Sequence, residues 1–206
     1  MKKRTIIFDF DGTIANSFSA FISVYNEIGK EYNLTQITAK EARELRNMTP
    51  RQVIRALKIS LFTLPFYLLK GRALFKKRID RVKPIEGIIP VLKKLSKTHH
   101  LGILTSNDQQ SVEHFLQKYE LDMFDFVHSE KNLFGKHKAL LALMTAHNIT
   151  QKEIIYVGDE VRDIESCKKA GVPIASVSWG LNSHELLASY KPEYLFDNPE
   201  QLLTLQ

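Results

Sequence analysis

The chain has 206 residues, of which 44% are apolar and 25% charged, with a net charge of +6 and one cysteine, Cys167. This length predicts one domain, or one domain that carries a sizeable insertion. The single cysteine excludes an intramolecular disulfide and a cysteine-rich zinc site, and no apolar run approaches the roughly 18–20 residues that span a bilayer. We therefore expect a cytoplasmic enzyme or binding protein.

The first 83 residues predict one strand followed by helices. The run T-I-I-F-D at residues 5–9 is short, apolar and ends in an acid, which is typical of a buried strand. Residues 17–32 have apolar side chains at helical spacing. Residues 38–83 also follow a helical pattern, with breaks expected at Thr49–Pro50 and near Lys70–Gly71.

Beyond Pro84 the pattern changes to alternating helices and strands. We expect helices near 86–97, 109–119, 138–147 and 161–170, and strands at 101–105, 126–128, 154–157 and 174–177. Strands separated by helices of about ten residues predict a parallel sheet with right-handed crossovers. The predicted fold class is therefore α/β, with a Rossmann-like parallel sheet core at 1–15 and 83–206 and an inserted all-helical cap at 16–82.

The positive charge is concentrated in this cap. Residues 37–83 contain thirteen basic and three acidic side chains, a net charge of +10, and the rest of the chain carries −4. Such a patch indicates an anionic partner such as nucleic acid, a membrane surface or a phosphorylated metabolite, although a solvated helical face explains it equally well. The aromatic residues in the stretch follow helical spacing and show no stacking platform, so we expect no nucleic-acid partner.

Polar residues follow the first four predicted strands, at the edge of the sheet where ligands of such folds bind. The first strand ends in D-F-D-G-T (9–13), where Asp9 and Asp11 can project from one side and Gly12 lets backbone N–H groups approach an anion. The second ends in L-T-S-N (104–107), whose hydroxyl and donor groups suit phosphate oxygens. G-K-H-K (135–138) follows the third strand, and G-D-E-V-R-D (158–163) follows the fourth.

Each of these segments, taken alone, is also an ordinary helix cap. Capping does not explain why several carboxylates converge at one edge, where their mutual repulsion is costly. A bound divalent cation would relieve that repulsion, and oxygen ligands together with a phosphate suit Mg²⁺.

The series D-F-D-G-T-I-A-N-S, L-T-S-N, a lysine and G-D-E-V-R-D resembles the haloacid dehalogenase superfamily, and more narrowly its phosphoglycolate-phosphatase-like branch with a helical cap after the first strand. The resemblance covers nearly the whole chain. It implies that Asp9 is the nucleophile that forms an aspartyl-phosphate. It also implies that Asp11 is the general acid and base and binds the metal through its backbone carbonyl. Gly12 is expected to contact the phosphate.

The resemblance also assigns the other strand ends. Thr105 would hydrogen-bond the phosphoryl group, with Ser106 and Asn107 beside it in phosphate binding. Asp159 and Asp163 would hold Mg²⁺ together with Asp9 and Asp11, with Asp163 binding either through water or behind the direct ligands. Relatives often have Lys-Pro-x-Pro at the third segment, whereas this chain has K-H-K-A. We favour Lys136 over Lys138 as the lysine that neutralises the nucleophile and phosphate.

Two features of the cap bear on the substrate. Arg46 and Arg51 flank a turn where relatives place a substrate-recognition loop, and they are candidates for a second anionic group, with ordinary surface arginines as the alternative. The apolar run 59–69 is best interpreted as core packing; a dimer contact or an apolar part of the substrate are the alternatives. A membrane-surface role is the least favoured of these.

We therefore predict a Mg²⁺-dependent phosphomonoester hydrolase of a small phosphorylated metabolite, present as a monomer or homodimer. A sugar-phosphate mutase on the same scaffold is the alternative within enzymes. A non-catalytic phosphate-binding or membrane-peripheral protein is the alternative outside them, but it has no need of Asp11 as a proton donor.

Overall fold

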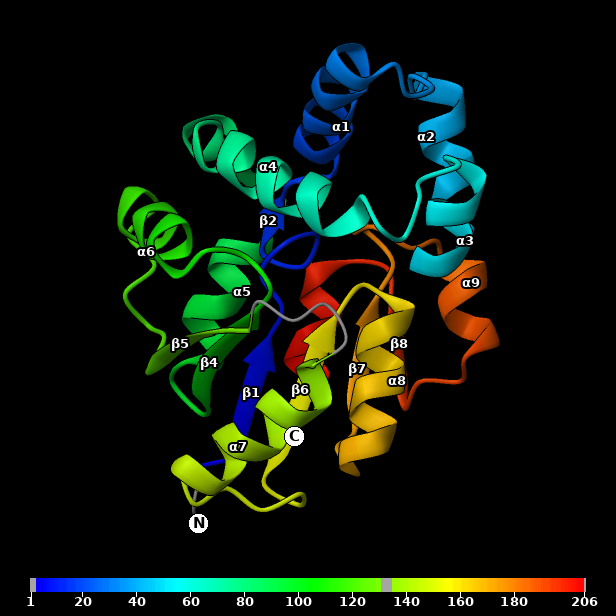
Figure 1. The fold of residues 1–206 in the computed structure, drawn as a ribbon. Coiled ribbons are helices and arrows are strands. Elements are labelled where there is room, and N and C mark those ends of the chain that lie inside the picture. The colour runs from blue at the N-terminus through cyan, green and yellow to red at the C-terminus, as the bar shows by residue number, and fades with distance from the viewer. Residues whose placement is uncertain (1–2, 131–134, 206) are drawn as a thin grey trace.

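The structure, a computed structural model, describes residues 3–130 and 135–205. Within them a six-stranded parallel sheet has the strand order β5-β4-β1-β6-β7-β8 (Figure 1). Its strands are β1 (Thr5–Phe8), β4 (His100–Thr105), β5 (Phe126–Ser129), β6 (Ile154–Gly158), β7 (Ile174–Val177) and β8 (Tyr194–Phe196). The first strand lies in the middle, paired with β4 on one side and β6 on the other.

Helices cover both faces of the sheet, because strand side chains alternate between its two faces. In β1, Ile6 and Phe8 belong to one apolar cluster and Ile7 to the other. One cluster packs against α7 (Lys136–Ala146) and α8 (Val161–Ala170), which lie in front of the sheet in Figure 1. The opposite cluster contains α5 (Ile88–Leu95), α6 (Gln109–Lys118) and the 3₁₀ helix η2 (Pro199–Thr204).

The cap lies between two short strands, β2 (Ala15–Asn16) and β3 (Lys83–Pro84), which pair antiparallel. It contains α1 (Phe18–Tyr32), α2 (Ala39–Leu45), α3 (Pro50–Ala56), α4 (Leu64–Lys76) and the 3₁₀ helix η1 (Ile79–Arg81). Thr38 and Thr49 each begin a helix with a reciprocal capping box. Helices α1 and α4 pack side by side above the sheet (Figure 1).

The predicted α/β class and parallel sheet are confirmed. The division at 15/16 and 82/83 stays a prediction, although β2 and β3 join the two parts there. The sequence did not predict β8, η2 or α9 (His184–Ser189). These elements follow β7 and extend the core beyond it.

The break expected near Lys70–Gly71 is wrong, because α4 continues through both residues. A glycine inside a helix costs only about 1 kcal/mol relative to alanine, which packing against α1 offsets. The non-helical interval lies at residues 57–63 instead, and α4 begins just before Pro65. Proline is tolerated there because the first turn of a helix has no intrahelical acceptors for its N–H groups.

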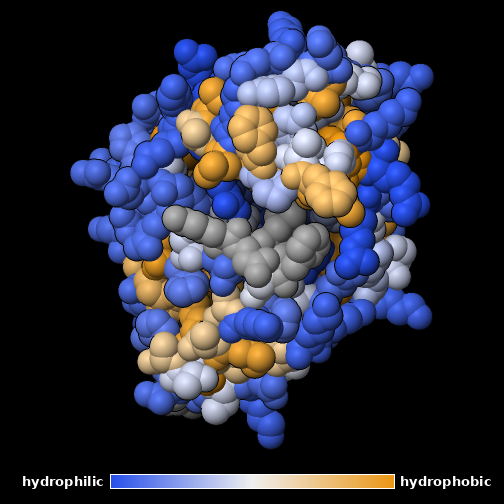
Figure 2. Space-filling view, in the orientation of Figure 1, coloured by the Kyte–Doolittle hydropathy of each residue, from blue (hydrophilic) through white to orange (hydrophobic). Residues whose placement is uncertain are grey.

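Core packing as the role of the apolar run 59–69 is also wrong for four of its large side chains. Phe62 is 97% exposed and Leu61 71%, and Phe66 and Leu69 are exposed as well. Figure 2 shows hydrophobic side chains among hydrophilic ones on the cap, in the upper part of the view. No helix within the described residues is both long and apolar enough to cross a bilayer.

Candidate active site

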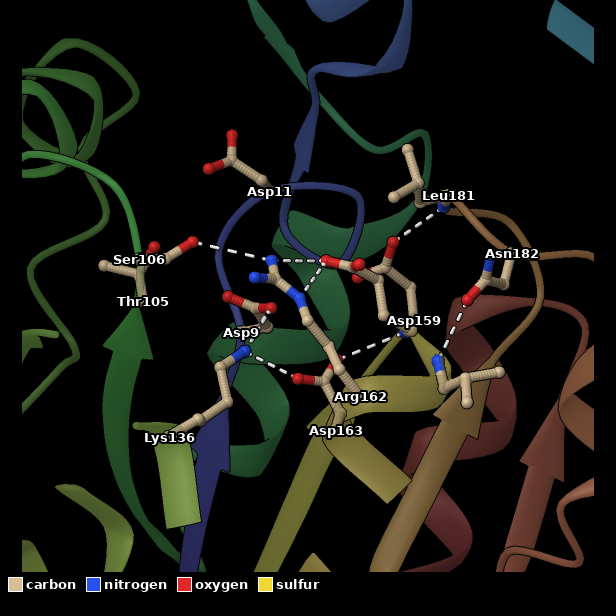
Figure 3. Close-up of polar contacts among 12 residues, drawn as sticks. Asp9, Asp11, Thr105, Ser106, Lys136, Asp159, Arg162, Asp163, Leu181 and Asn182 are labelled. Carbon is tan, nitrogen blue, oxygen red and sulfur yellow. Dashed lines mark hydrogen bonds and ion pairs between the residues drawn. The ribbon is translucent and has the colours of Figure 1, made fainter. Parts of the chain in front are cut away.

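The polar residues expected at the strand ends meet at one edge of the sheet, below the cap. Asp9 follows β1, Thr105 ends β4 and Asp159 follows β6, and because these three strands are parallel neighbours their ends come together (Figure 3). Asp9, Thr105 and Asp159 are all buried. The fold therefore places carboxylates and a hydroxyl in one small, poorly solvated volume.

Lys136, at the start of α7, joins two of the carboxylates. Its Nζ lies 2.7 Å from Asp9 Oδ2 and 2.6 Å from Asp163 Oδ1, and its side chain is 5% exposed. Burial lowers the pKa of Lys136, but the charges of Asp163 and Asp9 outweigh it, so the pKa is raised and the lysine stays cationic. Lys138, two residues further along α7, has an exposed side chain. The structure thus places Lys136, and not Lys138, beside Asp9.

Asp163 also caps the first turn of α8. Its Oδ2 accepts a hydrogen bond from the backbone N–H of Glu160, which completes a capping box at the start of α8. The capping role and the contact with Lys136 therefore use different oxygens of one carboxylate.

Asp159 is held by the two loops that flank it. Its Oδ1 accepts a hydrogen bond from Thr13 Oγ1 at 2.9 Å, and its Oδ2 accepts one from the Leu181 N–H at 2.6 Å. Gly12 has a φ of +75°, and a Cβ there would lie 2.1 Å from Asp159 Oδ2. The glycine of D-F-D-G-T is thus required both by its left-handed backbone and by the carboxylate beside it.

Asp9, Asp159 and Asp163 form an acidic group that fits a metal ion. Each offers a carboxylate oxygen, and these oxygens all lie within 4.8 Å of one another in a buried position. Burial raises the pKa of both Asp9 and Asp159, and neighbouring carboxylates raise it further. A buried, all-oxygen donor set with more negative charge than Lys136 alone neutralises suits Mg²⁺.

Asp11 lies apart from this group. Its Oδ2 accepts a hydrogen bond from Asn107 Nδ2 at 2.9 Å, and its Oδ1 has no hydrogen-bond partner among the described residues. In Figure 3 its carboxylate points away from the contact between Asp9 and Lys136. Burial, and then the charge of Asp9, raise the pKa of Asp11 to about 7, so near neutral pH much of it carries a proton that it can donate.

The residues at the end of β4 form a short turn. The buried Thr105 Oγ1 accepts a hydrogen bond from the Asn107 N–H at 3.0 Å. Ser106 and Asn107 lie at the cavity that extends from the site. Thr105, Ser106 and Asn107 thus lie at the same edge of the sheet as Asp9.

Arg162, within G-D-E-V-R-D, is a site residue to which the sequence pattern assigned no role. Its Nε donates to Glu160 Oε1 at 2.8 Å and its Nη2 to Ser106 Oγ at 3.5 Å, while Nη1 has no partner among the described residues. Burial lowers the pKa of Arg162, but Glu160 and Asp163 outweigh it, so the guanidinium stays charged. Its place one residue before Asp163, on the first turn of α8, was the available signal.

A cavity of about 390 Å³ opens above these residues, between core and cap. From the core it is lined by Asp11, Gly12, Ser106, Asn107, Glu160, Arg162 and Leu181. The remainder of its lining comes from the cap, mainly from α1 and α4.

Arg46 and Arg51, the expected contacts for a second anionic group, do not line this cavity. Arg51 is exposed. Arg46 Nη2 donates to the backbone carbonyl of Ser178 at 2.8 Å, which ties the end of α2 to the loop after β7. The side chain thus bridges cap and core beside the site, because the turn that follows α2 packs on that loop.

Comparisons with known proteins agree with this arrangement. The family described as haloacid dehalogenase-like hydrolase matches residues 6–177. The chain belongs to this family. A phosphoglycolate phosphatase of Synechococcus elongatus is 29% identical over 202 residues, which cover 97% of this chain and 95% of the relative.

Two further proteins extend the comparison. A pyrophosphatase PpaX of Bacillus mycoides is 27% identical over 215 residues and covers 100% of this chain and 97% of its own. The structure of a haloacid dehalogenase-like family hydrolase from Streptococcus pneumoniae has a TM-score of 0.82 at 20% identity, covering 98% and 97% of the two chains. The predicted membership of the haloacid dehalogenase family, and the predicted phosphatase-type enzyme, are confirmed.

Proposed function

We propose that this haloacid dehalogenase-like enzyme is a Mg²⁺-dependent phosphomonoester hydrolase that acts through an aspartyl-phosphate on Asp9, with a small phosphorylated metabolite as substrate. The observation that carries the proposal is the contact of Lys136 with Asp9, next to Asp159 and Asp163. The cavity beside this group is lined from the core by its chain neighbours, among them Asp11, Glu160 and Arg162. The phosphatase names of the curated relatives support it.

In the first step an oxygen of Asp9 attacks phosphorus and the bond from phosphorus to the ester oxygen breaks. The ester oxygen takes the proton of Asp11 and leaves as the alcohol. In the second step water attacks the phosphorus of the aspartyl-phosphate and gives a proton to Asp11. The bond between Asp9 and phosphorus breaks, inorganic phosphate leaves, and both carboxyl groups return to their starting states.

The surrounding residues position these groups and neutralise charge. Lys136 offsets the charge of Asp9 and of the phosphoryl oxygens. Arg162 has one nitrogen, Nη1, without a partner among the described residues, which can donate to the phosphoryl group. Asp9, Asp159 and Asp163 would hold Mg²⁺, which when bound supplies positive charge to the transferring group. Thr105 and the Asn107 N–H shape the turn that faces the phosphoryl group.

The test is phosphate release from a panel of phosphate monoesters with Mg²⁺, comparing the wild type with Asp9→Asn. We expect Asp9→Asn to lower kcat by roughly a thousandfold or more, because an amide in place of the carboxylate cannot attack phosphorus. Asp122→Asn, at an exposed aspartate, is the matched control and keeps full activity. Rapid quenching should also yield an Asp9-containing peptide with one added phosphoryl group.

Activity retained by Asp9→Asn would contradict the proposal. Turnover that needs a bisphosphate activator and releases little phosphate would indicate the mutase instead. Absence of turnover together with phosphate binding would indicate a binding protein.

A further inference from the structure

The cavity above the site has two chemically different ends. Its base is polar and consists of the side chains next to the nucleophile, including Asp11, Asn107 and Arg162. Its upper part lies in the cap and is lined mostly by hydrocarbon side chains, namely Phe18, Phe21, Val24, Ile28, Leu34, Val53, Ile59, Leu64, Leu68 and Phe75. A phosphoryl group at the base would therefore leave the rest of the ester against apolar surface.

The size of the cavity is large for a two-carbon acid. At about 390 Å³ it falls in the range of roughly 300–1,000 Å³ that is typical of sites for organic ligands. A small carboxylate in this space would need cations around it, and Arg46 and Arg51 lie elsewhere. Among the described lining residues the cap contributes one cation, Arg72, within a mostly apolar wall.

Gly71 lines the cavity without a side chain. It lies inside α4, where glycine is unfavourable relative to alanine. A Cβ at Gly71 would meet Ile28 Cδ1 and Val24 Cγ1 at 3.8 Å, which is ordinary contact, so neither crowding nor its backbone requires a glycine. The missing side chain leaves room in the cavity between α1 and α4.

We propose that the cap cavity binds an apolar organic group, so that the substrate is a phosphate monoester of an apolar alcohol. This inference rests on the proposed hydrolase function and specifies its substrate class. The apolar group would remove the hydrocarbon lining from water, which favours binding in proportion to the area covered. The phosphate end would stay at Asp9, and the ester oxygen would face Asp11.

The experiment measures kcat/KM for a series of linear alkyl phosphates from ethyl to octyl, each below its micelle concentration, with phosphoglycolate alongside. We expect kcat/KM to rise about fourfold for each methylene that becomes buried, until the cavity is full. Octyl phosphate should therefore exceed ethyl phosphate by about a hundredfold or more.

Two variants test whether the cavity causes this preference. Gly71→Leu places a side chain in the cavity and should lower the octyl-to-ethyl ratio by about tenfold or more, since several methylenes lose their place. Ala73→Leu adds the same side chain on an exposed position of the same helix and should leave the ratio unchanged. Thermal melting of both variants verifies that they fold.

Calorimetric binding of the same alkyl phosphates to Asp9→Asn gives a readout without turnover. A Kd that falls with chain length while no ester is hydrolysed by the wild type would contradict the hydrolase function and support the apolar site. Hydrolysis with kcat/KM independent of chain length, or a preference for phosphoglycolate over octyl phosphate, would overturn the inference and leave the hydrolase intact. No hydrolysis and no chain-length dependence of Kd would overturn both.

Discussion

At the scale of single residues, the site depends on a buried lysine between two buried carboxylates. Lys136 contacts Asp9 and Asp163 at 2.7 and 2.6 Å, and all three side chains are at most 5% exposed. Taking such charges out of water is costly, so a site of this kind is stable only while every charge keeps its partner. Lys138, two positions along the chain, is exposed and has no such constraint.

We expect Lys136→Met to lower kcat by roughly a hundredfold or more, because the charge that faces Asp9 and the phosphoryl group is lost. The same change should lower the free energy of unfolding by about 3–5 kcal/mol, since Asp9 and Asp163 lose their partner. Lys138→Met is the matched control and should change neither quantity. Steady-state kinetics and urea unfolding measure both effects, and similar behaviour of the two variants would exclude Lys136 from the site.

At the scale of secondary structure elements, the loop after β7 connects the cap to the core. Asn182 is buried, and its Oδ1 accepts a hydrogen bond from the Val161 N–H at the start of α8 at 2.9 Å. Its Nδ2 donates to the carbonyl of Met48 at 3.2 Å. The Ser183 N–H donates to the carbonyl of Arg46 at 2.9 Å. One loop therefore holds the beginning of α8, which carries Arg162 and Asp163, and the turn between α2 and α3.

Asn182→Ala should remove the side-chain hydrogen bonds of this connection and leave the Val161 N–H buried without a partner. We expect a loss of about 1–3 kcal/mol in the free energy of unfolding, the usual cost of such a group. Amides of residues 39–56 should exchange hydrogen faster in the variant, while those of α5, on the far part of the core, serve as the internal control. Unchanged exchange at 39–56 would show that other contacts hold the cap.

At the scale of the whole molecule, the acidic group should couple metal binding to stability. An ion that binds the folded chain at about 100 times its Kd adds about 2.7 kcal/mol to the free energy of unfolding. For a chain of this size that corresponds to a rise in Tm of about 5–10 °C.

We expect Mg²⁺ to raise the Tm of the wild type and of Asp122→Asn by this amount, and to have much less effect on Asp159→Asn. Chelation should abolish activity, and added Mg²⁺ should restore it. Differential scanning calorimetry with and without Mg²⁺ makes the comparison. An equal rise in Tm for Asp159→Asn would mean that the ion binds elsewhere.

The sequence alone determined the parallel core and the positions of its strand ends. Periodicity depends on neighbours along the chain, so alternating helices and strands are legible without tertiary contacts. Because parallel strands end at one edge, Asp9, Thr105 and Asp159 could be expected to meet there, and Lys136 could be preferred over Lys138. The turn D-F-D-G-T and its glycine could also be predicted, because a turn depends on residues that are adjacent in the sequence.

The tertiary structure alone decided which side chains complete the site and what the cap offers a substrate. Arg162 and Asn182 act through contacts with residues far away in sequence, such as Ser106 and Met48, and no local pattern records such contacts. Arg46 reaches the Ser178 carbonyl instead of the cavity for the same reason. The apolar cavity forms between α1 and α4. Helical periodicity predicts which residues share one face of a helix, but it does not predict how closely two helices pack.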